Sequence, residues 1–192
     1  MVSGAAAPDE PRVDPTAFVH PTAELESGVV VGAGTRIWRY AHIRSGAIIG
    51  ADTQLGANVF VDAGVRIGDR VKVQNNVSVY AGVELADEAF VGPAAVFTND
   101  LNPRATGSWQ LMPTYVRRGA SVGANATVLC GVELGEHCLV AAGAVVTRDV
   151  MPHQLVLGSP ARPAGWVCRC GTVVSRAADR PAGLDCDSCS HQ

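Results

Sequence analysis

Four cysteines near the end of the sequence have the spacing of a metal site. Cys168 and Cys170 form a Cys-x-Cys pair, and Cys186 and Cys189 form a Cys-x-x-Cys pair after a gap of fifteen residues. This is close to the spacing of a zinc ribbon, although the first pair is one residue shorter than the usual knuckle. A short tail without its own core needs such a staple. We therefore expect a structural zinc ion here, with free or redox-active thiols and disulfides as the alternatives.

A cluster of amides lies in the string VQNNVSVY, which contains Gln74, Asn75 and Asn76. If the bound molecule presents an amine, a positioned amide suffices to orient it. A neutral amine is already a nucleophile, so a strong protein base is not obligatory. Asn also tolerates left-handed backbone angles, so a turn residue is the alternative.

Histidine is the usual general base near neutral pH. His42, in the string YAHI, is expected to face outward, either as a substrate or catalytic residue or as the wall of a cleft. His20, His137 and His153 are expected to be structural: His20 in the first repeat, His137 at a surface corner, and His153 packing after the last repeat.

The elements that must position these side chains follow from a six-residue period. Every sixth residue from Val19 to Phe97 is aliphatic or Phe, and the step returns from Val122 to Val146. The residue four positions later is small or β-branched, and the residue directly after the aliphatic is often Gly. These positions are Val19, Leu25, Val31, Ile37, Ile43, Ile49, Leu55, Val61, Ile67, Val73, Val79, Leu85, Val91, Phe97, Val122, Val128, Leu134, Val140 and Val146.

A period of six fits neither a long strand nor a helix, but it fits a short strand followed by a tight corner. The aliphatic points inward, the small residue packs near the corner, and the Gly is expected to take the corner's unusual backbone angles. Three such faces close a triangular coil of eighteen residues, and stacked coils bury a continuous core. The sequence predicts an all-β chain of about six coils, with one long extruded loop at 98–121.

Composition excludes several classes of protein. The 192 residues carry a net charge of −3, and only 17% are charged, which argues against a nucleic-acid-binding surface. We find no transmembrane segment and no secretory signal, so we expect a cytoplasmic protein without a membrane partner. The expected organisation is a disordered leader at 1–16, a β-helix at 17–151, a connector at 152–166 and a Cys-rich tail at 167–192.

Together these repeats resemble the hexapeptide-repeat acyltransferases, over about residues 17–166. Strings such as TRIWRYAHIRSGAIIG, VQNNVSVY, GPAAVFTNDLNPR and LVLGSPAR are similar to sugar-nucleotide N-acetyltransferases that acetylate a 3-amino group, either UDP-2-acetamido-3-amino-glucuronate or dTDP-3-amino-sugar enzymes. The resemblance implies a left-handed parallel β-helix, a homotrimer with active sites in the clefts between subunits, and acetyl-CoA as cosubstrate.

The resemblance also implies roles for individual residues. Asn75 or Asn76 would orient the amine, with His42 as a further catalytic candidate. Substrate-binding candidates are Gln74, Tyr80, Asn99, Asn102 and Arg104. The strings GANAT and AAGAVV place pantetheine along late coils, and Arg residues would bind its phosphates. The resulting cofactor-binding candidates are Arg118, Gly123, Ala124, Ala142, Gly143 and Arg162.

Three other functions are considered. O-acetylation of a sugar or small molecule would need a well-placed His base, because hydroxyls are poor nucleophiles at neutral pH. A zinc carbonic anhydrase on the same fold needs three converging imidazoles, which the spacing of His20 and His42 disfavours. A non-catalytic scaffold would have no reason to keep the QNN string and the long loop. The sugar, the nucleotide and the pathway are not specified by the sequence.

Overall fold

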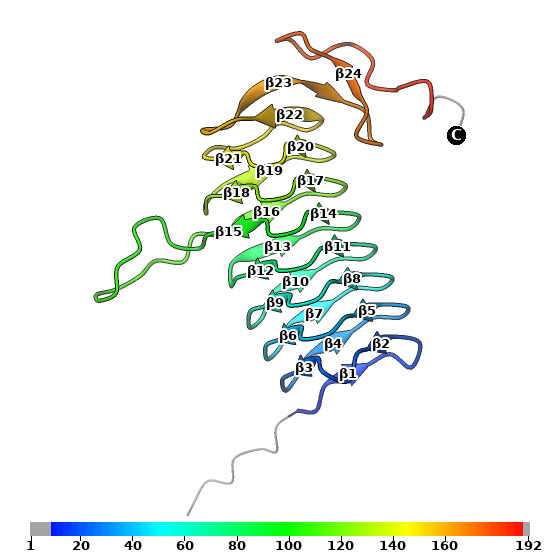
Figure 1. The fold of residues 1–192 in the computed structure, drawn as a ribbon, viewed down its shortest axis with the longest axis vertical. Helices are drawn as coiled ribbons and strands as arrows, with labels where there is room; N and C mark the ends of the chain where they lie inside the picture. Colours follow the sequence, from blue (N-terminus) through cyan, green and yellow to red (C-terminus); the bar gives the residue numbers. More distant parts are fainter. Residues whose placement is uncertain (1–8, 190–192) are drawn as a thin grey trace, which may run out of the picture.

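The computed structural model describes residues 9–189, which form a left-handed parallel β-helix with three flat sheets and two-residue strands (Figure 1). Sheet A contains β1 (Arg12–Val13), β4 (Val30–Val31), β7 (Ile48–Ile49), β10 (Arg66–Ile67), β13 (Val83–Leu85), β16 (Thr114–Val116) and β19 (Glu133–Leu134). Sheet B contains β2 (Phe18–Val19), β5 (Arg36–Ile37), β8 (Gln54–Leu55), β11 (Lys72–Val73), β14 (Phe90–Val91), β17 (Ser121–Val122), β20 (Leu139–Val140), β22 (Gln154–Leu157), β23 (Arg162–Val167) and β24 (Val173–Ser175). Sheet C contains β3 (Glu24–Leu25), β6 (His42–Ile43), β9 (Phe60–Val61), β12 (Ser78–Val79), β15 (Val96–Phe97), β18 (Thr127–Val128) and β21 (Val145–Val146).

The number of turns exceeds the expected six. Sheets A and C each have seven strands, so the chain makes seven complete turns, and β22 begins an eighth on sheet B. The prediction fell short because the six-residue step extends beyond the residues that defined it. Val13 precedes Val19 by six and lies in β1, which pairs with β4. Val116 precedes Val122 by six and is buried in β16.

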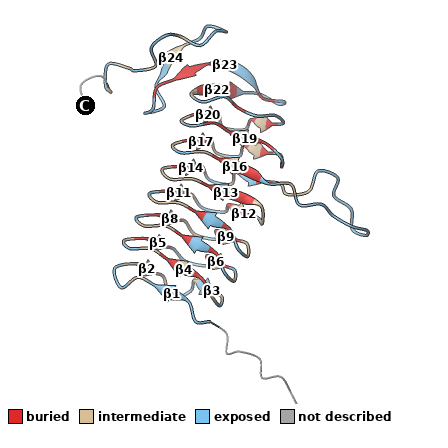
Figure 2. Ribbon diagram, turned by 180° about the vertical axis from the view of Figure 1, so that it is seen from behind, coloured by how far each residue is buried: buried red, intermediate tan, exposed pale blue. Residues whose placement is uncertain are grey.

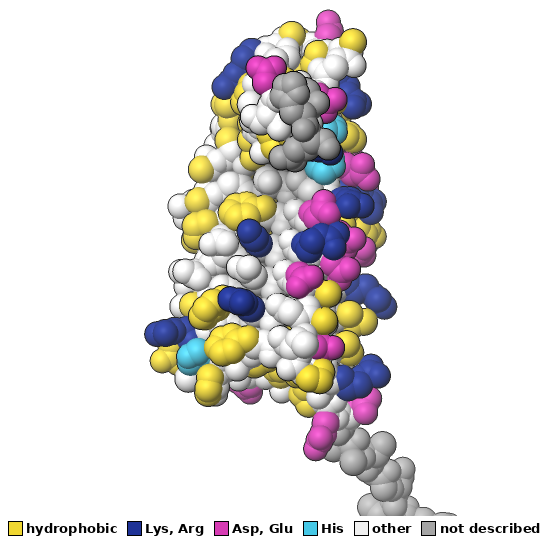
Figure 3. All heavy atoms as spheres, turned by 90° about the vertical axis from the view of Figure 1, so that its right-hand side faces the viewer, with side chains coloured by type: hydrophobic (Ala, Val, Ile, Leu, Met, Phe, Trp, Pro, Cys, Tyr) yellow, Lys and Arg dark blue, Asp and Glu magenta, His cyan; other side chains and the backbone are white. Residues whose placement is uncertain are grey.

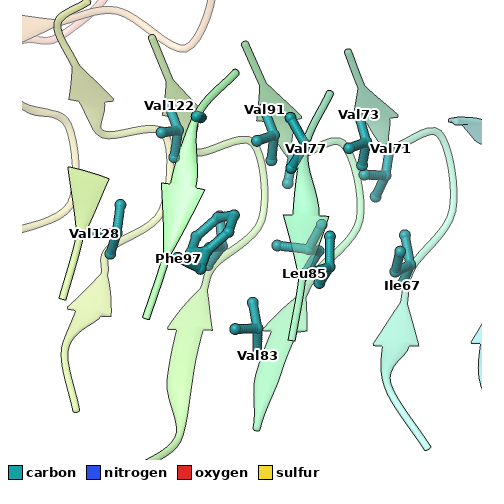
Figure 4. Close-up of a cluster of buried hydrophobic side chains, with 14 of the residues drawn as sticks. Ile67, Val71, Val73, Val77, Val83, Leu85, Val91, Phe97, Val122 and Val128 are labelled. Atoms are coloured by element: carbon teal, nitrogen blue, oxygen red, sulfur yellow. The ribbon is translucent and has the colours of Figure 1, made fainter. Parts of the chain in front are cut away.

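The core is the column of inward-facing residues that the period predicted (Figure 4). Strand pairs align residues eighteen apart, such as Lys72 with Gln54, so that equivalent positions stack along the axis. From Val31 to Val146 the predicted inward residues are all buried, and Val19 and Leu25 are partly exposed at the first turn. In Figure 2 many strands carry both exposed and buried residues, because one strand residue faces solvent and the next faces the core, and most of the extruded loop is exposed.

The corners use glycine differently from the expectation. The left-handed residue is the third after most inward aliphatics, as at Tyr40, Asn58, Asn76 and Gly143. Glycines directly after the aliphatic, such as Gly92, are instead required by stacking, because a Cβ on Gly92 would lie 2.6 Å from the amide nitrogen of Ala124 in the turn above. The predicted role in backbone angles is therefore wrong for these glycines.

Three boundaries differ from those expected. The extruded loop is residues 98–113 rather than 98–121, because β16 already pairs with β13 and β19. Part of the expected leader, residues 12–13, belongs to sheet A, and residues 1–8 lie outside the described residues. The expected connector contains β22, which runs parallel to β20, and most of β23, which turns back antiparallel to β22.

Residues 9–189 contain strands and turns but no α-helix, and hence no helix that could cross a membrane.

The stacking role of Gly92 can be tested by stability. We expect Gly92→Ala to lower the free energy of unfolding by about 1–3 kcal/mol in urea denaturation, because the added methyl group overpacks the corner. Ala94→Gly, at the left-handed position of the same turn, should change it by less than about 0.5 kcal/mol, because relief of strain offsets glycine's entropy. An unchanged stability for Gly92→Ala would contradict the stacking role.

Candidate functional site

The edge between sheets B and C brings together most of the predicted catalytic and cofactor-binding residues. We call it the B–C edge; it consists of residues 20–23, 38–41, 56–59, 74–77, 92–95, 123–126 and 141–144. From residues 38–41 upward its turns are joined by a backbone hydrogen bond at each step, including Asn76 N–H to Ala57 O at 3.0 Å and Ala94 N–H to Asn75 O at 3.0 Å. With about 4.8 Å between stacked strands, Gly123 and Ala124 lie roughly 10 Å above the Asn75 turn.

Asn75 has a structural task as well as an exposed position. Its Oδ1 accepts the backbone N–H of Ala57 at 2.8 Å, and Gly56 leaves room for it, since a Cβ there would lie 2.5 Å from that oxygen. At the edge between sheets A and B, Asp69 accepts the N–H of Ala51 and Asp87 that of Asp69. An Asx oxygen thus caps the turn below in both places. Asn75 differs because it also carries an Nδ2 group, which has no partner within residues 9–189.

Asn76 is the left-handed residue of the same turn, with φ of 61°. Its Oδ1 accepts a hydrogen bond from Asn58 Nδ2 at 3.0 Å, so an amide ladder links the two turns. The backbone alone does not demand Asn, since Tyr40, Ala94 and Gly143 hold the equivalent position along the edge. Both Asn75 and Asn76 are exposed, as the sequence predicted.

A hollow of about 250 Å³ lies beside the amides on sheet B. Its lining is Trp38, Arg39, Gln54, Gly56, Ala57, Val73, Gln74 and Asn75. Gln74 and Asn75 were predicted from sequence, but Trp38, Arg39 and Gln54 were missed. The sequence signal that could have indicated them is the eighteen-residue spacing of stacked positions. The same spacing places Arg36 directly below Gln54 and Lys72 directly above it. Arg36 and Lys72 therefore flank Gln54, which lines the hollow, on the two neighbouring strands of sheet B.

Small residues line the B–C edge above the amides, and we call them the small-residue track: Gly92, Gly123, Ala124, Ala142 and Gly143. Glycines are required at Gly92 and Gly123, because a Cβ on Gly123 would lie 2.5 Å from the amide nitrogen of Ala142. Ala142 and Gly143 are exposed at the top of this track. Beyond them Val145 N–H donates to Gly158 O and Ala161 N–H donates to Val145 O, so the turn before Arg162 is attached close to Gly143.

Arg118 is not on this edge. It lies at the corner between sheets A and B, where its guanidinium bonds Glu88 at 2.8 Å and Arg70 bonds the same carboxylate at 2.9 Å. These hydrogen bonds, that from Arg118 first, lower the pKa of Glu88. Acidic and basic side chains gather along the right-hand edge in Figure 3. Of the two predicted phosphate-binding arginines, the structure brings only Arg162 near the small-residue track.

His42 faces outward from sheet C, one face away from the hollow. Its Nε2 lies 2.9 Å from Glu26 Oε1, and its ring packs edge-on against Phe60. The pKa of Glu26 is lowered, chiefly because Oε2 accepts the backbone N–H of Ser45, and His42 and Arg44 add to the effect. Tyr80 packs on the other side of Phe60, with ring centroids 5.9 Å apart. The pair of His42 and Glu26 is a candidate base on sheet C, whereas Asn75 and Asn76 lie in a turn at the B–C edge.

Asn99, Asn102 and Arg104 lie in the extruded loop, which leaves sheet C after β15 and projects away from the prism (Figure 1). The backbone N–H of Met112 donates to Asn99 O at 3.1 Å and closes the loop's base. Arg104 bonds the carbonyl of its neighbour Pro103. Within this chain the structure does not bring these residues to the B–C edge.

The other histidines within residues 9–189 do not form an imidazole metal site. His137 and His153 pack ring against ring, 5.1 Å apart, and burial followed by the charge of His153 lowers the pKa of His137. His20 bonds Thr22 within the first turn. Within residues 9–189 the only group of three or more metal-ligating side chains in ligating range is the Cys168, Cys170, Cys186 and Cys189 cluster. The arrangement that a carbonic anhydrase needs is absent from this part of the chain.

The repeats match known family models. Residues 28–63 and 113–148 match the bacterial transferase hexapeptide (six repeats), and residues 46–81 match the hexapeptide repeat of succinyl-transferase. The chain is a hexapeptide-repeat protein. No curated protein sequence matches it.

Solved structures share the fold of this hexapeptide-repeat protein. A hexapeptide-repeat-containing acetyltransferase from Vibrio cholerae, complexed with acetyl coenzyme A, is 25% identical, with TM-score 0.54 over 62% of this chain and 69% of that one. A candidate acetyltransferase from Bacillus cereus is 19% identical, with TM-score 0.52 over 80% of this chain and 76% of that one. A perosamine N-acetyltransferase variant from Caulobacter crescentus, in complex with CoA and GDP-perosamine, is 23% identical. Its TM-score is 0.46, over 82% of this chain and 58% of that one.

The two tasks of Asn75 in the hexapeptide-repeat protein can be separated by stability. We expect Asn75→Ala to lower the free energy of unfolding by about 1 kcal/mol, because the Ala57 N–H loses its acceptor. Asn75→Asp should keep that acceptor and stay within about 0.5 kcal/mol of the natural protein. Urea denaturation measures both. If both variants lose the same free energy of unfolding, the Asn75 oxygen does not stabilise the protein by accepting the Ala57 N–H.

Proposed function

We propose that this protein is an acetyl-CoA-dependent N-acetyltransferase that acetylates the amino group of a nucleotide-linked 3-amino sugar. One observation carries the proposal: two exposed amides, Asn75 and Asn76, share the B–C edge with a track of small residues that leads upward from them. The strings that resemble sugar-nucleotide N-acetyltransferases include both the amides and the track. The hexapeptide-repeat family and the likeness to an acetyltransferase that binds acetyl coenzyme A support the acyl-transfer chemistry.

The amides can divide the work of the reaction between them. The Asn75 oxygen already accepts the Ala57 N–H, and the proposed role of Asn75 uses the donors of its Nδ2 group. In the proposed mechanism these donors bond the thioester oxygen as negative charge develops on it. Asn76 Oδ1 accepts one hydrogen bond, from Asn58, and keeps a second lone pair for an N–H of the sugar amine. That bond would hold the nitrogen lone pair toward the thioester carbon.

The reaction then needs no covalent enzyme intermediate. The neutral amine nitrogen attacks the thioester carbon and forms the C–N bond, the C–S bond breaks, and CoA leaves as a thiolate. The amine proton passes to that thiolate or to water. Because the nucleophile is neutral when it attacks, the residues have to position and stabilise rather than deprotonate it.

The hollow on sheet B suits the nucleotide part of the substrate. Trp38 is 40% exposed and offers an aromatic face on which a base can stack. Arg36 and Lys72, one turn below and one turn above Gln54, provide positive charge for a diphosphate. The amino sugar would then reach the edge at Gln74 and Asn75.

The small-residue track suits the pantetheine arm of acetyl-CoA. Ala124, Ala142 and Gly143 allow a thin chain to approach the backbone closely, and Arg162 above them is available for the phosphates. In a homotrimer, which the resemblance implies, the projecting loop would bring Asn99, Asn102 and Arg104 to the B–C edge of a neighbouring subunit. In that arrangement these loop residues would act at the site of a neighbouring subunit rather than at the B–C edge of their own chain.

The alternative is O-acetylation by the pair of His42 and Glu26. The 2.9 Å contact between them is the geometry of an oriented general base, and a hydroxyl nucleophile would require one. A non-catalytic scaffold is the second alternative, and it would leave the protein without any CoA-dependent turnover.

A single assay separates these functions. Thiol release from acetyl-CoA should be measured with a panel of UDP- and dTDP-linked 3-amino sugars and with the corresponding 3-hydroxy sugars. We expect turnover with an amino sugar, a loss of at least about tenfold in kcat for Asn75→Asp or Asn76→Gly, and little change for His42→Ala. Asn75→Asp is chosen because it keeps an acceptor for the Ala57 N–H. Asn76→Gly is chosen because glycine readily takes the left-handed backbone angles of that position.

The opposite outcomes would overturn the proposal. If both Asn variants keep the natural rate, the amide mechanism is wrong. Turnover of a hydroxy sugar that is abolished in His42→Ala would identify an O-acetyltransferase instead. No thiol release with any acceptor, in a folded trimer that binds acetyl-CoA, would point to a scaffold or to a substrate outside this class.

A further inference from the structure

Four thiols from two separate segments meet beyond the last turn of the β-helix. The sulfur atoms of Cys168, Cys170, Cys186 and Cys189 all lie within 4.8 Å of one another, and Cys170 Sγ lies 3.4 Å from Cys186 Sγ. Ligands at about 2.3 Å around one tetrahedral zinc ion stand roughly 3.8 Å apart. The four sulfurs are therefore already at nearly the separation that a shared metal ion requires.

Both cysteine pairs are presented by tight turns. Cys168 directly follows β23; its N–H donates to Thr172 O, and Gly171 N–H donates back to Cys168 O, both at 2.8 Å. In the second pair Cys189 N–H donates to Cys186 O at 2.9 Å. Arg169 Nη2 also reaches Cys189 O at 3.4 Å, which connects the two turns. Each turn aims two thiols at the same point.

The segment that carries the second pair has little else to hold it. Residues 176–189 contain no strand, and most of them are exposed. The indole of Trp166 donates to Ala177 O at 3.2 Å near the start of the segment. A segment that buries so little apolar surface needs a covalent or metal staple to stay in place.

We propose that Cys168, Cys170, Cys186 and Cys189 bind one structural Zn²⁺ ion, which fastens residues 176–189 to the end of the β-helix. Four thiolates in a tetrahedral arrangement favour zinc over hard cations. A disulfide between Cys170 and Cys186 does not fit this geometry, because their sulfur atoms are 3.4 Å apart, well beyond the S–S bond length of about 2.05 Å. With all four positions filled by protein ligands the ion has no open site, so its role is structural rather than catalytic.

The metal would also shape a surface of sheet B. Arg169, Cys170 and Gly171 form one wall of a hollow of about 190 Å³, and Ser121 and His137 belong to the opposite wall. In Figure 1 the chain beyond β24 runs on the side of the molecule that carries β17 and β20. Fixing the first cysteine turn therefore fixes the shape of this hollow.

Metal analysis of the purified full-length protein tests the site. We expect about one zinc ion per chain, and less than about a tenth of that in Cys170→Ser and Cys189→Ser. The matched control is Cys130→Ala, a buried cysteine outside the cluster, which should keep its zinc. Far-UV circular dichroism on every variant checks that the β-helix remains folded, since seven turns lie outside the tail.

A second measurement detects the staple directly. Stripping the metal with a chelator should speed tryptic cleavage after Arg176, an exposed residue at the start of the segment, and added Zn²⁺ should restore resistance. The proposal is overturned if the folded protein holds no zinc and takes up none, if it holds iron instead, if Cys170→Ser and Cys189→Ser retain the ion, or if thiol counting in denaturant finds the tail cysteines oxidised. Unchanged cleavage after metal removal would overturn the fastening role.

Discussion

At several corners of this β-helix the stacked turns come so close that a side chain does not fit between them. At Gly92 and Gly123 a single added Cβ would meet the backbone of the next turn at 2.5–2.6 Å. The third residue after most inward aliphatics takes left-handed angles to complete the turn. The side chains at the second and third positions project outward, both where the first position is a glycine and where it is a side chain such as Gln74. The amides at Asn75 and Asn76 occupy these two positions, so the packing of the corner itself presents the candidate chemistry to solvent.

The same constraint gives each edge of the prism its own chemical character. Along the edge between sheets A and B, carboxylates and guanidinium groups stack from turn to turn, as Arg70, Glu88 and Arg118 do. Along the B–C edge the equivalent positions carry amides, small residues and, at the first turns, aromatic rings. Charged pairs at an exposed edge add little stability. The charged pairs of the edge between sheets A and B are therefore not what holds the fold together.

Much of this arrangement follows from the sequence, because the period of six determines which residues face inward. The core column, the three-sided coil and the exposure of Asn75 and Asn76 were all predictable from it. The number of turns was underestimated because Val13 and Val116 stood just outside the recognised runs. The role of Gly92 was misjudged because a close approach between turns leaves no signal in local sequence. The hollow at Trp38 and Gln54 was missed because it forms only when residues from three successive turns stack.

Other site residues depend on contacts that sequence spacing does not reveal. Arg118 immediately precedes a returning repeat, yet the corner turns it toward Glu88 and away from the small-residue track. His42 lies in β6 on the face of sheet C, whereas Asn75 lies in the turn between β11 and β12, at the B–C edge. The four cysteines, by contrast, converge as their spacing suggested, since two short turns are enough to bring them together.

The central claim is that the B–C edge holds the sugar amine and the thioester together at Asn75 and Asn76. A crystal structure of the protein with CoA and a nucleotide-linked 3-amino sugar tests this most directly. The account predicts the amine nitrogen within about 3.5 Å of an Asn75 or Asn76 amide atom, with pantetheine along Ala124, Ala142 and Gly143. A sugar amine bound on sheet C beside His42, or a CoA arm that follows another edge, would contradict it.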